Sequence, residues 1–193
     1  SPSRGLGEVY KRQVLSSYAH QYNVTKLRWM FPGGANGQES ICNGIYGLKN
    51  IDVKNDDLVL IHDAVRPLVS QSIISSNIAT CKHYGYAITG IRCREAILES
   101  EDGFYSTTSI SRDKLIRTQT PQTFRLEDII NAHEKAKEKG IVNSVSSCTL
   151  LAELGGYEMH IVPGEGRNIK ITTTEDLEIF KVMLQTSKEE WLK

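Results

Sequence analysis

The sequence predicts an α/β layer fold with parallel strands. From residue 15 onward, short apolar runs alternate with longer amphipathic segments, which is typical of strands joined by helices. A glycine-rich turn at Gly33–Gly34 lies where an apolar run gives way to a helical pattern. A second apolar run, residues 58–61, ends directly at polar residues, as strands that lead into a ligand site do. No linker-like stretch divides the chain, so we expect a single domain.

Short apolar runs followed by turn-forming or polar residues predict five strands: Lys26–Phe31, Asp57–Ile61, Tyr86–Ile91, Tyr157–Val162 and Ile169–Thr172. Amphipathic segments predict five helices: Gln38–Leu48, Gln71–Tyr84, Leu126–Lys139, Ser147–Leu154 and Thr174–Gln185.

Two segments depart from this alternation. Ser100–Thr118 is polar and β-branched in places, and it predicts a β-hairpin or arm off the main sheet, spanning about residues 95–118, with Asp102–Gly103 as its turn. The first thirteen residues show neither strand alternation nor a helical stripe, and the chain begins with Ser1 rather than Met. We interpret residues 1–13 as a non-native or disordered leader, with a frayed native tail as the alternative, and residues 14–193 as the domain.

Composition excludes several classes of protein. The 193 residues carry 23 basic and 23 acidic side chains, so the net charge is zero and broad binding to nucleic acid or to anionic membranes is not expected. The four cysteines are far apart and match no zinc or disulfide pattern. No apolar run is long enough to span a bilayer, and no secretory leader is recognisable, so we expect a cytoplasmic protein.

Four segments contain residues suited to chemistry. The first, Gly33 to Ser40, leaves a strand and enters a helix, where backbone N–H groups suit an anion or a base edge, although such turns need glycine for steric reasons at least as often. In the second, residues 58–67, an apolar strand delivers Asp63 at its carboxyl end, with Arg66 three residues later. Asp63 could hold a divalent metal and Arg66 a phosphate, or the two could form an ion pair that caps a turn. His62 is expected to be packed and hydrogen-bonded.

The third segment, Gln119 to Phe124, contains Pro121 between hydroxyl and amide side chains and predicts a rigid loop. The fourth, Gly166 to Thr172, places Lys170 on the opposite face of a predicted strand from its apolar neighbours. A lysine in that setting is usually solvated, and it matters for function only if its face lines a cleft.

The ordered set IHDAVRP, QTPQTF and NIKITT closely resembles the cytidylyltransferases that make CDP-alcohols from CTP and a polyol phosphate. The resemblance covers roughly residues 31–184. One branch acts on 2-C-methyl-D-erythritol 4-phosphate in isoprenoid synthesis, and the other on D-ribitol 5-phosphate in teichoic-acid or capsule synthesis. The resemblance implies a Rossmann-like, mostly parallel sheet of the nucleotide-diphospho-sugar transferase type with a β-arm, and a homodimer that exchanges this arm.

The resemblance also implies the roles of individual residues. The cytidine would lie against four residues, Gly34, Ala35, Ser40 and Ala64. The metal, Mg²⁺, and the nucleotide would meet Asp63. The polyol phosphate would meet Arg66, Arg112 and Thr120, with Arg112 reaching the neighbouring subunit from the arm.

Lys170 would neutralise charge on the reacting phosphates, so the resemblance implies that Lys170, Arg112 and Asp63 carry catalysis. The reaction it implies is in-line attack by the substrate phosphate on the α-phosphorus of CTP, with pyrophosphate leaving. This step needs positioning and charge neutralisation rather than a covalent intermediate.

Some positions depart from the isoprenoid branch. Gly37 stands where that branch usually has arginine, Ala35 where it often has aspartate, and Glu95–Ala96 where Asp-Thr is usual, while Ser146–Ser147 replace a common acidic pair. These differences narrowly favour D-ribitol 5-phosphate, with 2-C-methyl-D-erythritol 4-phosphate as the alternative. A non-catalytic dimerisation or binding module and a transferase that uses UTP or GTP remain further alternatives.

The family opens with a glycine-rich loop that holds the CTP triphosphate, and nothing in residues 1–30 matches it. We therefore expect this chain to be an N-terminally incomplete copy with impaired activity, because one lost charge-stabilising contact can reduce a rate by about 10²- to 10³-fold.

Overall fold

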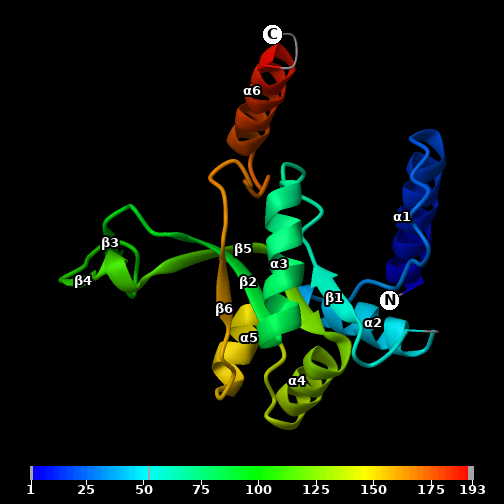
Figure 1. The fold of residues 1–193 in the computed structure, drawn as a ribbon, viewed down its shortest axis with the longest axis horizontal. Helices are drawn as coiled ribbons and strands as arrows, with labels where there is room; N and C mark the ends of the chain where they lie inside the picture. Colours follow the sequence, from blue (N-terminus) through cyan, green and yellow to red (C-terminus); the bar gives the residue numbers. More distant parts are fainter. Residues whose placement is uncertain (1, 52, 191–193) are drawn as a thin grey trace. The chain divides into compact units, whose positions relative to one another are not determined.

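The computed structural model describes residues 2–51 and 53–190, and the side chains of residues 11–51 and 53–186. Helices and strands alternate along much of the chain (Figure 1), so the predicted α/β class is confirmed. The elements are α1 (Pro2–Gln21), α2 (Gly37–Lys49), β1 (Leu58–Ile61), α3 (Gln71–Tyr84), β2 (Tyr86–Arg92), β3 (Ile97–Glu99), β4 (Thr108–Ile110), η1 (Arg112–Lys114), β5 (Ile116–Arg125), α4 (Leu126–Glu138), α5 (Ser147–Leu154), β6 (His160–Pro163) and α6 (Thr174–Glu190).

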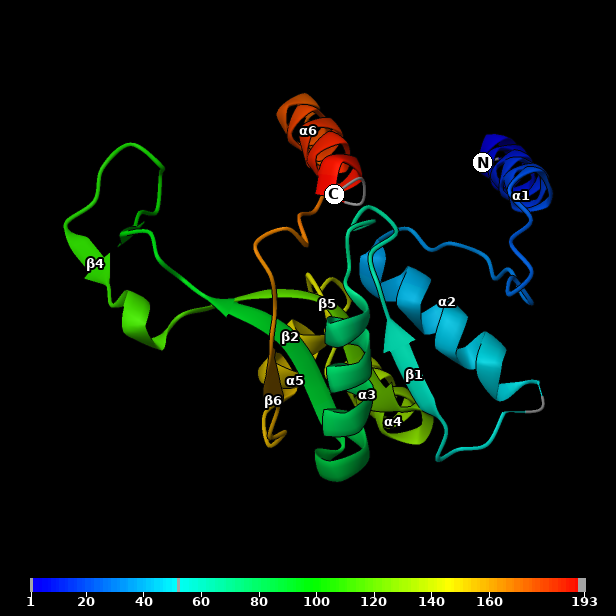
Figure 2. The ribbon, with the colours of Figure 1, turned by 45° about the horizontal axis from the view of Figure 1, so that its top comes forward.

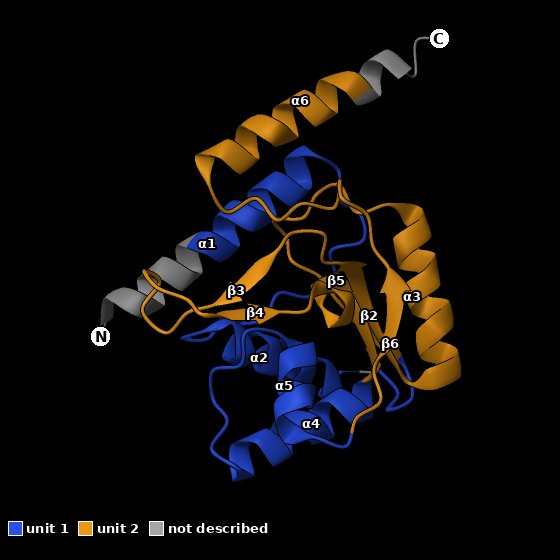
Figure 3. Cartoon of the chain, turned by 90° about the vertical axis from the view of Figure 1, so that its left-hand side faces the viewer, with its two compact units in different colours: residues 1–57, 126–156 blue, residues 58–125, 157–193 orange. Residues whose placement is uncertain are grey.

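The chain divides into two compact units (Figure 3). Residues 1–57 and 126–156 form unit 1, which contains α1, α2, α4 and α5. Residues 58–125 and 157–193 form unit 2, which contains the strands, α3 and α6. Each unit is therefore built from two separate stretches of sequence.

The sheet of unit 2 is mixed rather than uniformly parallel. Its strand order is β1-β5-β2-β6, in which β5 is antiparallel to both of its neighbours and β6 is parallel to β2. β1, β2 and β6 thus share one direction, and β5 opposes them. The reason is the connection: the chain leaves β2 into the arm and returns beside β2 as β5, and a strand that returns in this way runs antiparallel.

Strand β5 contradicts the predicted loop at residues 119–124. The strand is central in the sheet and is buried from Gln119 to Phe124, including Pro121. A proline has no N–H for a ladder, and the β2/β5 register shifts between Ile88 and Gly90, where the Thr89 hydroxyl donates to the Pro121 carbonyl at 2.6 Å. The Pro121 carbonyl is thus satisfied by a side chain at the register shift, where the regular backbone ladder is interrupted.

We predict that Thr89→Val lowers stability more than Thr123→Val. Both threonines are fully buried and contact Asn77, but Thr89 accepts from Asn77 Nδ2 at 2.8 Å and donates to Pro121, whereas Thr123 makes one bond of 3.5 Å. Thr89→Val leaves a donor and a carbonyl without partners, which costs about 2–4 kcal/mol, and Thr123→Val should cost less than half of that. Urea unfolding of both variants tests this, and equal losses would contradict it.

Helix α3 packs on the sheet of unit 2 (Figures 1 and 2). Its predicted bounds match the observed ones because both ends are signalled locally. Ser70 Oγ accepts from the Ile73 N–H at 3.2 Å, and Gly85 ends the helix at φ 90°. Cys81 from this helix packs with Ala87 and Val162 of the sheet. The core of unit 2 therefore lies between α3 and the sheet.

The predicted arm is present. Strands β3 and β4 pair antiparallel in a two-stranded sheet of their own, which extends from β2 and β5 (Figure 2). Asp102 accepts at Oδ1 from the Phe104 and Tyr105 N–H groups, and Gly103 has φ 77°. The expected Asp-Gly turn is therefore confirmed. The Phe104 and Tyr105 side chains are 86% and 83% exposed.

The helices of unit 1 also begin at local signals. Asn36 Oδ1 accepts from the Glu39 N–H at the start of α2, and Ser146 and Thr149 form a capping box at the start of α5. The sequence predicted no regular structure over the first thirteen residues, whereas the structure has helix α1 from Pro2 to Gln21. That expectation is wrong for the described residues of this segment.

Two predicted strands are absent from the described part of the chain. Residues 26–31 pair with no other strand, and residues 169–172 make a single backbone bond to the neighbouring loop, from the Ile171 N–H to the Val65 carbonyl at 2.8 Å. Apolar composition alone does not make a strand, because a strand needs a partner for its backbone groups. Within the described residues, no helix has the length and apolarity that a bilayer span requires.

Candidate functional site

The carboxylate of Asp63 binds two cations in unit 2. The residue follows β1 after one intervening position, and its Oδ2 lies 3.3 Å from Arg66 Nε and 3.2 Å from Lys170 Nζ. Arg66 also donates from Nη1 to the Asn168 carbonyl at 2.7 Å. The Arg66, Asp63 and Lys170 side chains are 11%, 31% and 47% exposed, so the cluster is half-buried with its lysine toward solvent. Its net charge of one positive suits an anionic ligand.

Hydrogen bonds through His62 connect Thr120 to the cluster of Asp63, Arg66 and Lys170. Thr120 Oγ1 accepts from the Asp63 N–H at 2.9 Å and lies 3.0 Å from His62 Nδ1, while His62 Nε2 lies 3.0 Å from the Arg66 carbonyl. A carbonyl only accepts, so in the neutral imidazole Nε2 carries the hydrogen and Nδ1 accepts from Thr120. His62 is thus a hydrogen-bonded residue, as predicted, and it accepts the Thr120 hydroxyl hydrogen.

The sequence interpretation missed Asn168. Its side chain is fully buried and donates to the Thr120 carbonyl at 2.9 Å and to Gln119 Oε1 at 3.3 Å, and its backbone carbonyl accepts from Arg66. Asn168 thereby ties the segment that carries Lys170 to the two segments that carry Arg66 and Thr120. The sequence offered only an asparagine two residues before the lysine, and its burial, which requires hydrogen-bond partners, is seen in the structure alone.

The remaining predicted residues lie elsewhere. Ala64 is exposed in the turn directly after Asp63. Arg112 lies in the arm, where its Nη1 donates to the Arg94 carbonyl at 2.7 Å. Within the chain, the structure thus brings together Asp63, Arg66, Thr120 and Lys170, and it shows no contact between this cluster and Arg112 among the described residues.

The glycine turn that precedes α2 belongs to unit 1. The Gly34 N–H donates to Ser40 Oγ at 2.9 Å, and the Ala35 N–H donates to the Glu39 carboxylate. A Cβ on Gly34 would lie 2.5 Å from Glu39 Cβ, so this position needs glycine. These two N–H groups of the predicted ligand-binding turn are thus bonded within the turn, and the Glu39 carboxylate accepts one of them as a bound anion would.

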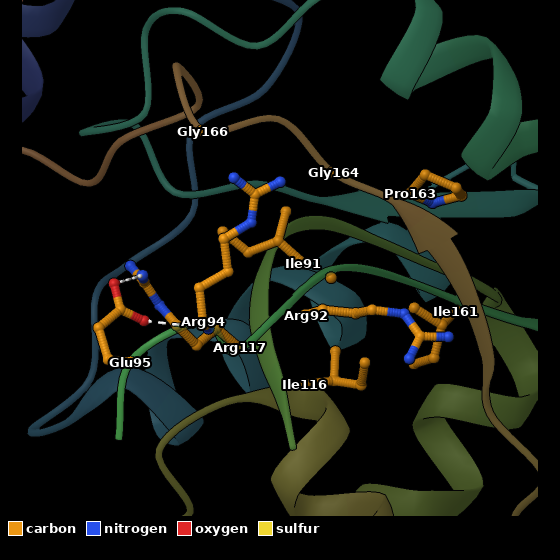
Figure 4. A pocket seen from close by; sticks show the side chains of 11 residues that line it. Ile91, Arg92, Arg94, Glu95, Ile116, Arg117, Ile161, Pro163, Gly164 and Gly166 are labelled. Atoms are coloured by element: carbon orange, nitrogen blue, oxygen red, sulfur yellow. Dashed lines mark hydrogen bonds and ion pairs between the residues drawn. The ribbon is translucent and has the colours of Figure 1, made fainter. Parts of the chain in front are cut away.

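A basic cleft of about 800 Å³ lies at the root of the arm (Figure 4). Arg92, Arg94 and Arg117 line it together with Glu95, which forms a 3.5 Å ion pair with Arg117. Figure 4 shows the Arg92 side chain pointing toward Ile161, on the other side of the cleft from Glu95. The cleft also borders Gly164 and Gly166, which begin the segment that carries Asn168 and Lys170. Excess positive charge in this cleft favours a phosphate-bearing ligand.

A divalent metal fits this site only in combination with a phosphate ligand. No group of three or more metal-binding side chains occurs in the described part of the chain. Asp63 Oδ2 is taken by Arg66 and Lys170, but Oδ1 has no hydrogen-bond partner among the described residues. Mg²⁺ is commonly held by one or two carboxylates together with substrate phosphates, so Asp63 Oδ1 meets that requirement.

Comparison with known proteins decides the family. Residues 12–186 match the model of the IspD family, 2-C-methyl-D-erythritol 4-phosphate cytidylyltransferase. The chain belongs to this family. It is therefore a nucleotidyltransferase of the cytidylyltransferase type by descent, as the motifs predicted.

Relatives with two different substrate names are similar to the chain. A ribitol-5-phosphate cytidylyltransferase of Lacticaseibacillus paracasei is 35% identical over 87% of this chain and 72% of its own length. A 2-C-methyl-D-erythritol 4-phosphate cytidylyltransferase of Clostridium acetobutylicum is 34% identical over 89% and 72%. The crystal structure of the Thermus thermophilus 2-C-methyl-D-erythritol 4-phosphate cytidylyltransferase superposes with a TM-score of 0.69 at 27% identity, over 79% of this chain and 71% of that one. The Rossmann-like class of the cytidylyltransferase fold is thus confirmed.

Proposed function

We propose that this chain transfers the cytidylyl group of CTP to a polyol phosphate and releases pyrophosphate. Membership of the family supports this activity. The observation that assigns it to specific residues is that Asp63, just after β1, forms ion pairs with both Arg66 and Lys170. Two cations fixed on one carboxylate provide a preorganised site for phosphate charge. The basic cleft at the arm root is a second feature that suits phosphate-bearing substrates.

In the reaction we propose, an oxygen of the polyol phosphate attacks the α-phosphorus of CTP. The new P–O bond forms as the bond to the bridging oxygen breaks, and the electron pair leaves with pyrophosphate. Lys170 and Arg66 neutralise the charge that develops on the phosphates, and Asp63 fixes the direction of both. Thr120, whose hydrogen is directed to His62, offers an acceptor, which suits a hydroxyl of the polyol better than a phosphate oxygen.

We include Mg²⁺ in this proposal, held by Asp63 Oδ1 and the nucleotide phosphates. When bound, the metal would reduce the charge of the triphosphate and thereby assist pyrophosphate departure. The roles of Gly34, Ala35 and Ser40 toward cytidine, and of Ala64 beside Asp63, are also part of the proposal.

For the acceptor we favour D-ribitol 5-phosphate over 2-C-methyl-D-erythritol 4-phosphate. The residues Ala35, Gly37 and Glu95–Ala96 depart from the isoprenoid pattern, as do Ser146–Ser147. Relatives with either substrate name have similar identity to the chain, so the choice rests on these departures and not on overall similarity. We also propose a cytoplasmic setting, which suits cysteines that form no disulfide within the described part of the chain.

The experiment measures pyrophosphate release with each acceptor in turn. We expect ribitol 5-phosphate with CTP to give the highest rate, and UTP or GTP to give much lower rates with the same acceptor. A higher rate with 2-C-methyl-D-erythritol 4-phosphate would reverse the choice of acceptor. If no combination of nucleotide and acceptor released pyrophosphate, and the chain formed a stable dimer, the result would support the non-catalytic dimerisation module instead.

We further propose that two copies of the chain associate through the arm. The arm exposes Leu98, Phe104 and Tyr105 by 65%, 86% and 83%, and it also carries Arg112. Large apolar side chains gathered at an extended hairpin favour burial against a partner. An arm that docks on a second copy would bring Arg112 to the neighbour's polyol phosphate.

We predict that Phe104→Asp converts the dimer to a monomer, because the substitution would place a charge inside an apolar contact. Sedimentation equilibrium tests this. Val145→Asp is the matched control, because Val145 is 92% exposed and lies in unit 1, outside the arm. A Phe104→Asp protein that stays dimeric, or a wild-type chain that sediments as a monomer, would contradict association through the arm.

A further inference from the structure

Unit 1 contains a cavity whose lining includes none of the residues to which the proposed reaction gives a role. It lies between helix α2, the second half of α4 and the segment that follows α4, and its volume is about 370 Å³. This volume is at the lower end of small-molecule sites, so it suits a single-ring compound rather than a nucleotide. Its lining residues are Asn36, Gln38, Glu39, Cys42, Tyr46, His133, Lys137, Ile141 and Val142.

His133 is the unusual residue of this cavity. It is only 5% exposed, and its Nε2 has no hydrogen-bond partner among the described residues. Burial lowers the pKa of His133, so the ring is neutral at pH 7. A buried ring nitrogen without a partner is destabilising, and native proteins seldom keep one without a reason. A ligand atom that bonds to Nε2 supplies such a reason.

Lys137 provides the charge. It lies one turn after His133 on α4, lines the same cavity, and has no ion pair within 4.0 Å among the described residues. The acidic residue of the lining, Glu39, is already bonded to the Ala35 N–H. Glu39 keeps its negative charge but is held toward the turn, so Lys137 is the cation of the lining with which a ligand carboxylate can pair.

Much of the remaining wall is apolar or flat, and the amides of its polar members, Asn36 and Gln38, are already bonded to the Val142 and Ile141 carbonyls. Ile141 and Val142 contribute aliphatic surface, and Tyr46 contributes a ring whose hydroxyl lies 3.4 Å from Glu134. The pKa of the Cys42 thiol is raised by burial and by the Glu39 carboxylate, so Cys42 lines the cavity as a neutral thiol. Such a wall suits the faces of a planar ring.

We propose that this cavity binds a small planar organic acid, whose ring substituent bonds to His133 Nε2 and whose carboxylate pairs with Lys137. Binding is transmitted to the glycine turn, because two lining residues hold that turn: Asn36 Oδ1 accepts from the Glu39 N–H, and Glu39 accepts from the Ala35 N–H. This transmission depends on the hydrogen bonds of the turn and not on the proposed role of the turn toward cytidine.

The test uses the full chain and three probes: nicotinate, 3-hydroxybenzoate and benzoate. Nicotinate offers His133 an acceptor, 3-hydroxybenzoate offers a donor, and benzoate offers neither. Titration calorimetry measures affinity, and NMR follows the amides of Gly34 and Ala35. We expect one of the first two probes to bind about tenfold more tightly than benzoate and to shift both amides. No CTP is present, so failure of the proposed reaction does not affect the result.

Three variants define the site. Lys137→Met should weaken the preferred probe about tenfold, whereas Lys49→Met, an exposed lysine of α2 outside the lining, should not. His133→Phe should remove the preference over benzoate and, because it also removes the unpaired nitrogen, raise the melting temperature of the ligand-free chain by a few degrees. The proposal is overturned if no probe binds at millimolar concentration, or if His133→Phe leaves the preference intact.

Discussion

Lys170→Met is expected to reduce the rate of pyrophosphate release by about 10²- to 10³-fold. The substitution removes the ammonium group that lies 3.2 Å from Asp63 Oδ2 and keeps most of the apolar stem. Charge builds up on the phosphates during transfer, and a fixed cation stabilises that state more than it stabilises bound substrate. The loss should therefore fall mainly on kcat and less on KM.

Stability should hardly change in this variant, because the Lys170 side chain is 47% exposed and such ion pairs contribute little. Lys82→Met is a suitable control, since Lys82 is an exposed lysine of α3 with no contact to the cluster. Steady-state kinetics and thermal melting distinguish the two effects. A Lys170→Met protein whose kcat stays within threefold of the parent would remove Lys170 from the catalytic proposal.

Asp63→Asn is the second substitution for which we expect a large loss of activity. The amide has the shape of the carboxylate but lacks its charge, so Arg66 and Lys170 lose the anion that holds them together and the proposed metal loses its protein ligand. We expect a loss of about 10²-fold in kcat/KM, accompanied by a higher Mg²⁺ concentration for half-maximal rate. Activity measured across a magnesium series, with Asp113→Asn in the arm as control, tests both parts.

The two substitutions should not be additive, because both side chains meet at one oxygen atom. In a double-mutant cycle, the combined variant should lose far less than the product of the two single losses. Independent losses would mean that Asp63 acts on the metal alone and does not orient Lys170, which would contradict the arrangement seen at Oδ2.

Local signals explain which elements the sequence could predict. The bounds of α3 and α5 follow from residues that cap them directly, namely Ser70 and Gly85 for one and Ser146 and Gly155 for the other. The arm was predictable for the same reason, since its turn is made by Asp102 bonding to the next residues. Caps and tight turns involve neighbours in sequence, so no knowledge of the rest of the fold is needed.

Strand pairing was not predictable in the same way. Residues 26–31 carry Leu, Trp, Met and Phe, enough apolar surface for a strand, but they have no partner strand among the described residues, whereas β5 contains Pro121 and still lies in the centre of the sheet. What decides both cases is the neighbouring chain: Thr89 supplies the Pro121 carbonyl with a bond that no local pattern contains.

The sequence by itself determined the chemistry of the candidate site. The spacing of Asp63 and Arg66 after an apolar strand, together with the motifs around Thr120 and Lys170, was sufficient to name the family and the side chains. Only the tertiary structure decided how they act on one another. It places Lys170 and Arg66 on the same carboxylate oxygen, and it bonds buried Asn168 to Thr120, 48 residues away in sequence, and to Arg66, 102 residues away. The physical reason is that charge pairing and hydrogen bonding depend on distance in space, which the order of residues does not contain.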